Sequence, residues 1–117
     1  MQDITYMRVC SRKDLPANST RRFQVPLLKG MVEGFLVRRR TRIFAYRNVC
    51  PHWGVSLDND SDNLLTENRR YIICANHGAV FDIATGVCLA GPCVGESLGV
   101  LRVKLAGQQI YVEHPKL

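Results

Sequence analysis

The chain has 117 residues, of which 46% are hydrophobic and 22% are charged. This length and composition suit one compact domain with its own core, and they exclude a disulfide-stapled miniprotein and a disordered chain. Because no run of about 18 apolar residues occurs, we expect no membrane-spanning helix. The first residues lack a basic stretch followed by an apolar one, so we expect no secretory signal and a cytoplasmic location.

The charge is markedly basic. Sixteen Lys and Arg against ten Asp and Glu leave a formal net charge of +6, concentrated in arginine runs at 21–22, 38–42 and 69–70. These runs carry no interleaved aromatic residues, and no helix is predicted that could enter a groove, so we do not expect nucleic-acid binding. Most of these arginines are expected to be solvated strand ends and turn tips, and together they suit an acidic docking surface on a partner protein.

The predicted elements are short strands, because no segment keeps apolar residues at helical spacing for three turns. In chain order, strands are expected over 4–9, 22–25, 34–38, 42–47, 71–73, 80–82, 87–89, 101–105 and 109–113. A polar tip at 39–41 and a turn at 106–108 predict hairpins, and Thr85-Gly86 marks another turn. The pattern predicts an all-β fold of stacked antiparallel sheets, as a sandwich or a partial barrel.

One long loop is predicted, over residues 53–70. It contains Asp58-Asn59-Asp60-Ser61-Asp62-Asn63, which has the carboxylate spacing of a calcium loop. It lacks the glycine at the sharp turn, and Glu67 falls at the wrong offset, so we interpret the segment as a solvated loop. Asp58 and Glu67 are expected to pair with Arg69 and Arg70 inside it.

Two short segments carry the chemistry, and we call them the first and second clip. The first is Cys50-Pro51-His52-Trp53-Gly54, and the second is Cys74-Ala75-Asn76-His77-Gly78. Two thiolates and two imidazoles can bind zinc or a mixed-ligand iron–sulfur cluster. Common zinc sites use Cys-x-x-Cys knuckles with paired histidines, whereas each clip here mixes one cysteine with one histidine. Mixed clips suit two irons with unlike ligands, both cysteines on one iron and both histidines on the other.

The pattern Cys50-x-His52 followed by Cys74-x-x-His77 resembles the signature of the Rieske iron–sulfur family, and in particular its low-potential, ferredoxin-like members. The stretch 77–82, the Thr-Gly turn, Gly91-Pro92 and the final hairpin are also similar, so the resemblance covers about 34–112. It implies one Rieske-type domain over 1–117, with a small cluster-binding subdomain of two loops at about 48–93. It also implies one [2Fe-2S] cluster per chain, held by Cys50, His52, Cys74 and His77.

The resemblance implies an electron carrier and not an enzyme. Its partners would be a reductase and a terminal oxidoreductase, such as an aromatic-ring-hydroxylating oxygenase, and neither nucleic acid nor a membrane is expected. Two alternatives remain at this point. One is the electron-transfer small subunit of a larger oxidoreductase, such as a nitrite reductase, and the other is a zinc-stabilised binding module without a redox role.

Departures from the family pattern make further predictions. His52 and Cys74 are separated by 21 residues, more than is usual in the family, and a surface loop tolerates such an insertion. High-potential members have a serine and a tyrosine where this chain has Ala79 and Phe81, and a disulfide where it has Val55 and Asn76. Without those hydrogen-bond donors, we expect a midpoint potential of about −150 mV.

Three cysteines remain outside the clips. Cys88 and Cys93 flank Gly91-Pro92 and are interpreted as small packing residues, with a disulfide, a redox pair or a second metal clip as alternatives. Cys10 is expected to be a strand residue. His114 is expected to be solvated, and Trp53 to pack near the first clip or to contact a partner.

Overall fold

The computed structural model describes residues 5–26, 30–51, 54–58, 61–76 and 78–113. It consists of ten strands and a single 3-10 turn: β1 (Tyr6–Ser11), η1 (Arg12–Asp14), β2 (Ser19–Pro26), β3 (Met31–Arg39), β4 (Arg42–Arg47), β5 (Tyr71–Ile73), β6 (Val80–Asp82), β7 (Cys88–Ala90), β8 (Val100–Leu101), β9 (Val103–Ala106) and β10 (Gln109–Glu113). No helix in these ranges is long and apolar enough to cross a membrane.

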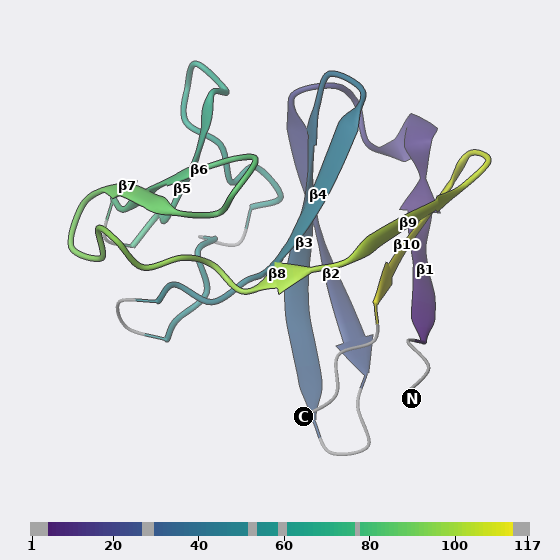
Figure 1. The fold of residues 1–117 in the computed structure, drawn as a ribbon, viewed down its shortest axis with the longest axis horizontal. Coiled ribbons are helices and arrows are strands. Elements are labelled where there is room, and N and C mark those ends of the chain that lie inside the picture. The colour runs from purple at the N-terminus through teal and green to yellow at the C-terminus, as the bar shows by residue number, and fades with distance from the viewer. Residues whose placement is uncertain (1–4, 27–29, 52–53, 59–60, 77, 114–117) are drawn as a thin grey trace.

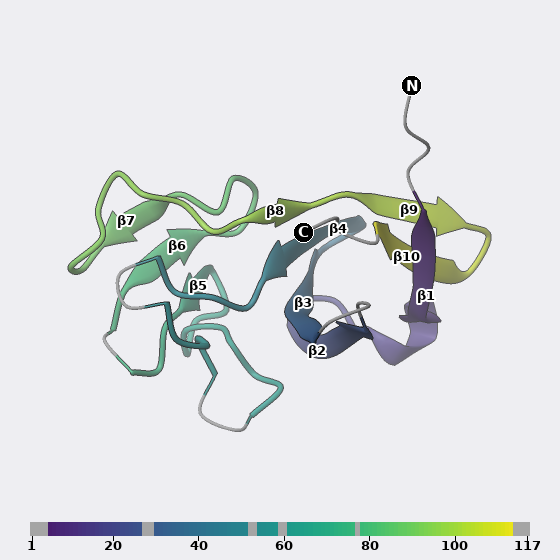
Figure 2. The same ribbon diagram turned by 90° about the horizontal axis from the view of Figure 1, so that it is seen from below.

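The strands form three antiparallel sheets, with the orders β1-β10-β9, β2-β3-β4-β8 and β5-β6-β7. Figure 1 and Figure 2 show them side by side along the longest axis, with the four-stranded sheet in the middle. The prediction of an all-β fold of stacked antiparallel sheets is therefore confirmed.

The middle sheet is covered on both faces, and its sequence explains why. In β3, the four consecutive residues from Gly34 to Val37 are buried, where a half-exposed strand would alternate. Leu36 packs into a core with the β1-β10-β9 sheet, whereas Phe35 and Val37 face the core shared with the β5-β6-β7 sheet. Successive side chains of a strand point to opposite faces, so β3 connects the two cores.

Tyr46 on β4 anchors the β5-β6-β7 sheet to the middle one. Its ring is buried, and its hydroxyl donates a 2.5 Å hydrogen bond to the carbonyl of Ile83, in the turn after β6. Burial raises the pKa of Tyr46 to about 12, so the hydroxyl keeps its proton for this bond at neutral pH.

Leu101, Val103 and Leu105 alternate with polar residues, a pattern that predicts one half-buried strand over 101–105, but these residues do not form a single strand. Leu101 in β8 pairs with Ala45 of the middle sheet, while Val103 in β9 pairs with Val112 of the β1-β10-β9 sheet. The chain crosses between the sheets at Arg102 (Figure 2). Leu105 was expected on the buried side, but it is 42% exposed because β9 lies at an edge of its sheet.

The segment before β5 is less solvated than predicted. Leu57, Leu64 and Leu65 are buried in the core beneath the β5-β6-β7 sheet. Leu65 also forms an isolated bridge with Ile72 of β5. The predicted loop therefore contributes three apolar side chains to the core, whereas residues 61–63 and 67–70 are exposed.

Candidate metal centre

The first clip follows β4 and folds back on its own cysteine. The amide of Cys50 donates to the carbonyl of Val55 (2.6 Å), and the amide of Gly54 donates to the carbonyl of Cys50 (2.8 Å). Gly54 has φ +70°, a left-handed conformation that glycine adopts without steric cost. The two bonds close a short loop between Cys50 and Val55.

The second clip, after β5, repeats this backbone arrangement. The amide of Cys74 donates to the carbonyl of Ala79, and the amide of Gly78 donates to the carbonyl of Cys74, both at 2.8 Å. Gly78 has φ +69°, within a degree of its counterpart in the first clip. The two cysteines therefore hold equivalent positions in two equivalent loops.

Both predicted cysteine ligands are buried in one core. Cys50 and Cys74 are each 0% exposed and belong to the same cluster of buried residues. The other two predicted ligands, His52 and His77, lie outside the described residues, as do Trp53 and His114. Within the described residues, no three His, Cys, Asp or Glu side chains are placed to hold a metal. Two buried thiols at matched positions fit the cysteine half of the donor set that a mixed-ligand [2Fe-2S] cluster requires.

Two hydrogen bonds tie the segment after the first clip to the second clip. The side chain of Asn76 donates to the carbonyl of Ser56 (2.9 Å), and the amide of Ala75 donates to the carbonyl of Leu57 (2.8 Å). The sequence predicts no disulfide between Val55 and Asn76, and the side-chain amide of Asn76 makes this hydrogen bond instead. No local pattern of residues indicates that hydrogen bond.

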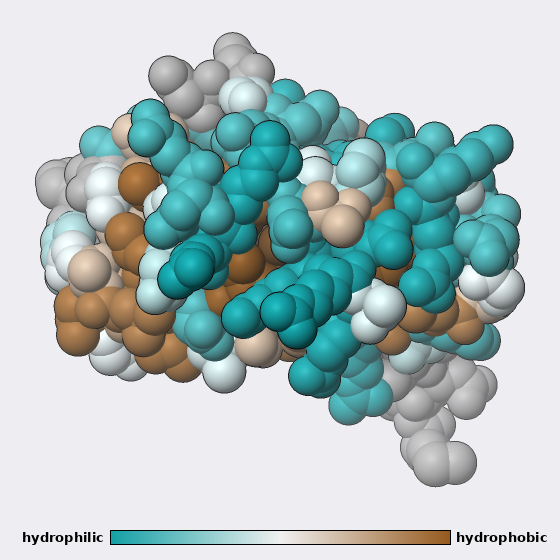
Figure 3. Space-filling model, turned by 90° about the horizontal axis from the view of Figure 1, so that it is seen from above, coloured by the Kyte–Doolittle hydropathy of each residue, from teal (hydrophilic) through white to brown (hydrophobic). Residues whose placement is uncertain are grey.

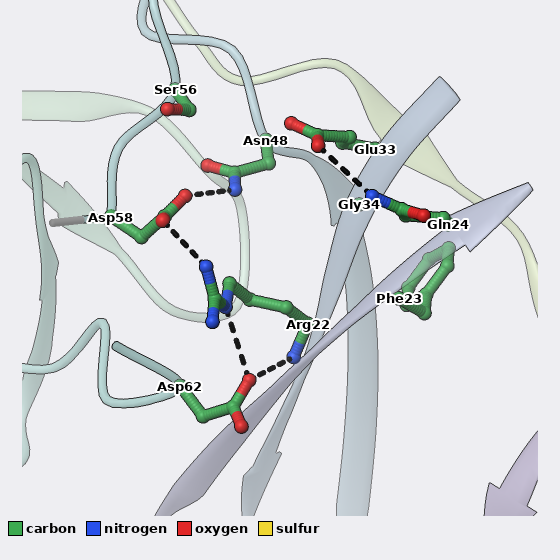
Figure 4. A pocket seen from close by; sticks show the side chains of 9 residues that line it. All are labelled: Arg22, Phe23, Gln24, Glu33, Gly34, Asn48, Ser56, Asp58 and Asp62. Atoms are coloured by element: carbon green, nitrogen blue, oxygen red, sulfur yellow. Dashed lines mark hydrogen bonds and ion pairs between the residues drawn. The ribbon is translucent and has the colours of Figure 1, made fainter. Parts of the chain in front are cut away.

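A polar network holds the segment that follows the first clip, and Figure 4 shows three of its side chains, Arg22, Asn48 and Asp58. Asn48, just after β4, is buried, and its side-chain Oδ1 accepts a 2.8 Å hydrogen bond from the backbone amide of Leu57. Its amide nitrogen donates to Asp58 (2.5 Å), and Asp58 in turn pairs with Arg22 of β2 (2.7 Å). The chain Arg22–Asp58–Asn48 thus connects the middle sheet to the segment between the clips.

Arg22 makes a second ion pair, with Asp62, in which Nε donates to Oδ1 at 3.1 Å. These hydrogen bonds hold the pKa of Asp62 below its usual range. In the part of the chain that the structure describes, both ion pairs involve Arg22, so the expected pairing of Asp58 with Arg69 or Arg70 is wrong. The sequence could not indicate this, because Arg22 and Asp58 are 36 residues apart.

The surface around the clips carries several exposed apolar side chains. Exposed apolar side chains flank the first clip and the segment around Gly91: Val49, Val55, Leu89 and Val94. Figure 3 shows apolar side chains gathered at the end that carries β5, β6 and β7, and hydrophilic ones over most of the remaining face. Such a patch is typical of a surface that contacts another protein.

Two of the three arginine runs meet at the other end of the strands. Arg39 and Arg40, at the β3–β4 tip, line one hollow with Arg69 and Arg70, which precede β5. Arg69 donates to the carbonyl of Asn18 in the same place (3.0 Å). Because β4 and β5 begin here and end at the two clips, this basic surface is separated from the clips by the length of both strands.

Three comparisons with known proteins relate the chain to one family. Residues 5–112 match the model of the Rieske [2Fe-2S] domain. The chain is 26% identical to the ferredoxin CarAc of Metapseudomonas resinovorans, over 95% of both chains. It is 30% identical to apoptosis-inducing factor 3 of Homo sapiens over 98% of this chain, but it spans only 17% of the length of that protein.

Solved structures show the same fold. The ferredoxin of carbazole 1,9a-dioxygenase from Nocardioides aromaticivorans superposes with a TM-score of 0.72 at 26% identity, covering 96% of this chain and 99% of that one. A chain in a complex of reduced oxygenase and oxidised ferredoxin in carbazole 1,9a-dioxygenase matches with a TM-score of 0.74 at 24% identity, covering 96% and 95%. The second likeness concerns the fold alone.

Proposed function

This chain belongs to the family of Rieske [2Fe-2S] domains, and we propose that it is a ferredoxin that carries single electrons between two other proteins. Its cofactor is one [2Fe-2S] cluster, which when bound accepts and releases one electron. We assign Cys50, His52, Cys74 and His77 as its ligands. The observation that carries this assignment is the equivalence of the two clips, which present two buried cysteines from loops with the same hydrogen bonds.

The residues of the chain have three tasks in this proposal. The clips orient the ligands, and the core beneath them keeps water from both thiolates. Two neutral imidazoles in place of two thiolates leave the oxidised cluster with less negative charge, so an electron is added more easily than to a four-cysteine cluster. The cluster-binding unit spans about 48–93 of one Rieske-type domain.

The proposed partners are a reductase that supplies the electron and an oxygenase that receives it. Support comes from two ferredoxins, CarAc and the ferredoxin of carbazole 1,9a-dioxygenase, each of which this chain matches over nearly its full length. The exposed apolar side chains around the clips suit such a docking face, because electron transfer requires close approach to the cluster. We propose a non-catalytic carrier in the cytoplasm, whose basic surface suits an acidic protein.

A second candidate is an electron-transfer domain or subunit of a larger oxidoreductase, such as the small subunit of a nitrite reductase. Its support is the match to apoptosis-inducing factor 3, of which a segment the size of this chain is only 17%. A stable complex with a larger flavin or haem protein, isolated from cells at low and high salt, would favour this candidate over a free carrier.

The test begins with the purified chain. We expect a red-brown protein with two irons and two acid-labile sulfides and a Rieske-type electron-spin resonance signal after reduction. Added to a ferredoxin reductase and NADH, it should accelerate the reduction of a Rieske oxygenase, and the Cys10→Ser variant should do so equally well. A colourless protein with one zinc would contradict the cluster, and a red protein that no reductase reduces would contradict the carrier role.

A further inference from the structure

Two cysteines outside the clips lie against each other. Cys88 begins β7 and Cys93 follows five residues later, and their sulfur atoms are 3.0 Å apart. The side chains are only 2% and 3% exposed. A disulfide bond is about 2.05 Å long, so a movement of about 1 Å would bring the two atoms to bonding distance.

The backbone between the two cysteines is arranged as a closed loop. The amide of Cys88 donates to the carbonyl of Glu96 (2.8 Å), and the amide of Glu96 donates to the carbonyl of Cys93 (2.9 Å). Gly91, Pro92 and Val94 lie on the exposed side of the loop. The thiols therefore face inward beneath a thin surface segment, which can admit a small reagent by a local opening.

This loop packs directly on the second clip. Gly91 has φ +101°, and a Cβ atom at this position would lie 2.8 Å from the Cα atom of Ala79. The carbonyl of Ala79 accepts the amide hydrogen bond of Cys74. Any restriction of the loop's movement therefore also restricts the backbone of Ala79, whose hydrogen bond closes the second clip.

We propose that Cys88 and Cys93 form a reversible disulfide, which clamps the loop of Gly91 and Pro92 onto the second clip. The oxidant is a low-molecular-weight disulfide such as oxidised glutathione. One cysteine thiolate attacks it to give a mixed disulfide and releases one glutathione thiol. The other cysteine displaces the second glutathione, so two electrons and two protons leave the pair and one S–S bond replaces another.

The local environment makes the reaction slow. The attacking species is a thiolate, and both thiols are buried, so neither reacts until the loop opens to water. We therefore expect the bond to form over hours, as the loop opens, and to persist once it is buried again.

The test uses the cluster-containing chain, incubated anaerobically with oxidised glutathione at several ratios to reduced glutathione. Free thiols are then blocked in denaturant, the disulfides are reduced, and the released thiols are labelled and located by tandem mass spectrometry. All five cysteines are accessible in denaturant. The number of free thiols per chain should therefore be five in the reduced chain and about three in the oxidised chain. Cys88→Ser and Cys93→Ser should each abolish the doubly labelled product, and Cys10→Ser, the matched buried control, should keep it.

A second measurement tests the clamp and rests on the proposed ligand assignment. The oxidised and reduced chains are exposed to an iron chelator, and the loss of visible absorbance is followed. We expect the oxidised chain to lose its cluster at least twofold more slowly, with no such difference in Cys88→Ser.

The outcomes separate the parts of the proposal. A number of free thiols that stays at five, label at other cysteines, or a glutathione adduct that never resolves would overturn the disulfide. A disulfide with unchanged cluster loss would overturn the clamp. A disulfide in a chain that binds no cluster would contradict the ferredoxin proposal and leave the pairing of Cys88 and Cys93 intact.

Discussion

The two clips have the same backbone hydrogen bonds, but different contacts support them in the folded chain. Cys50 and Cys74 lie in loops that have the same two backbone hydrogen bonds. The segment after the first clip, however, is held by Asn48 and by Arg22, which both contact Asp58. The second clip is supported by the close approach of Gly91 and the core around it. Equivalent ligand loops can therefore rest on a charged network or on apolar packing, and these two supports respond differently to substitution, salt and pH.

The largest effect is expected from the ligands, where the clips should behave alike. Replacing Cys50 or Cys74 with Ser, or His52 or His77 with Ala, should remove the cluster, because a [2Fe-2S] cluster requires four ligands. The iron and acid-labile sulfide contents should fall from two of each per chain to about zero in all four variants. Cys10→Ser is the control, since that buried side chain lies in the other core. A variant at either histidine that keeps the visible spectrum would refute that ligand.

The next-largest effect should distinguish Gly91, in the loop that packs on the second clip, from the glycines of the two clips. Gly91→Ala introduces a Cβ atom 2.8 Å from a backbone atom at a positive φ, so we expect a loss of about 3 kcal/mol in unfolding free energy. Gly54→Ala and Gly78→Ala have the same kind of φ but open space around the new atom, so each should cost about 1 kcal/mol. Urea unfolding of the three variants checks the order, and an equal loss in all three would contradict it.

Midpoint potentials compare the two residues that directly follow the clips, Val55 and Ala79. Ala79 and Val55 accept the same hydrogen bond from their respective cysteines, but Ala79 is fully buried and Val55 is 40% exposed. Ala79→Ser should raise the potential by tens of millivolts, because a buried hydroxyl donor near sulfur favours the reduced cluster. Val55→Ser should change it less, since water already reaches that side. Voltammetry should place the wild type near about −150 mV, and a midpoint well above zero would contradict the low-potential prediction.

The smallest effect should come from Arg22, and it should depend on charge. Arg22→Met removes both ion pairs, so we expect faster loss of the cluster to a chelator, with Arg21→Met as the neighbouring control. The pKa of Asp62 is lowered in the folded chain, so its stabilising effect is complete above the ordinary aspartate pKa of about 4 and is lost as the pH falls through the lowered value. The difference in the rate of cluster loss between wild type and Arg22→Met should decrease at high salt. A difference that is unchanged in 1 M salt would mean that Arg22 acts by packing.

Much of the fold was predictable because it is encoded locally. The strands at 42–47, 71–73, 80–82 and 109–113 have the predicted bounds, since each alternates or forms a short apolar run between turn residues. The errors occur where distant segments meet. Leu101 and Val103 continue one alternating pattern, but they pair with different sheets. Leu57 looked like part of a polar loop, but it is buried because the β5-β6-β7 sheet lies above it.

The candidate site likewise has features that the sequence predicts and features that only the folded structure decides. The sequence by itself predicts the ligand set, because the Cys-x-His and Cys-x-x-His spacings are short-range patterns, and the mixed ligands that they propose would set the charge of the cluster. It also determined which donors are missing, at Ala79, Phe81, Val55 and Asn76. Only the tertiary structure decided what supports each clip, including the pairing of Arg22 with Asp58 across 36 residues and the 3.0 Å approach of Cys88 and Cys93. Such contacts depend on how the three sheets pack, and no local pattern of residues encodes a distance between segments that meet only in the folded chain.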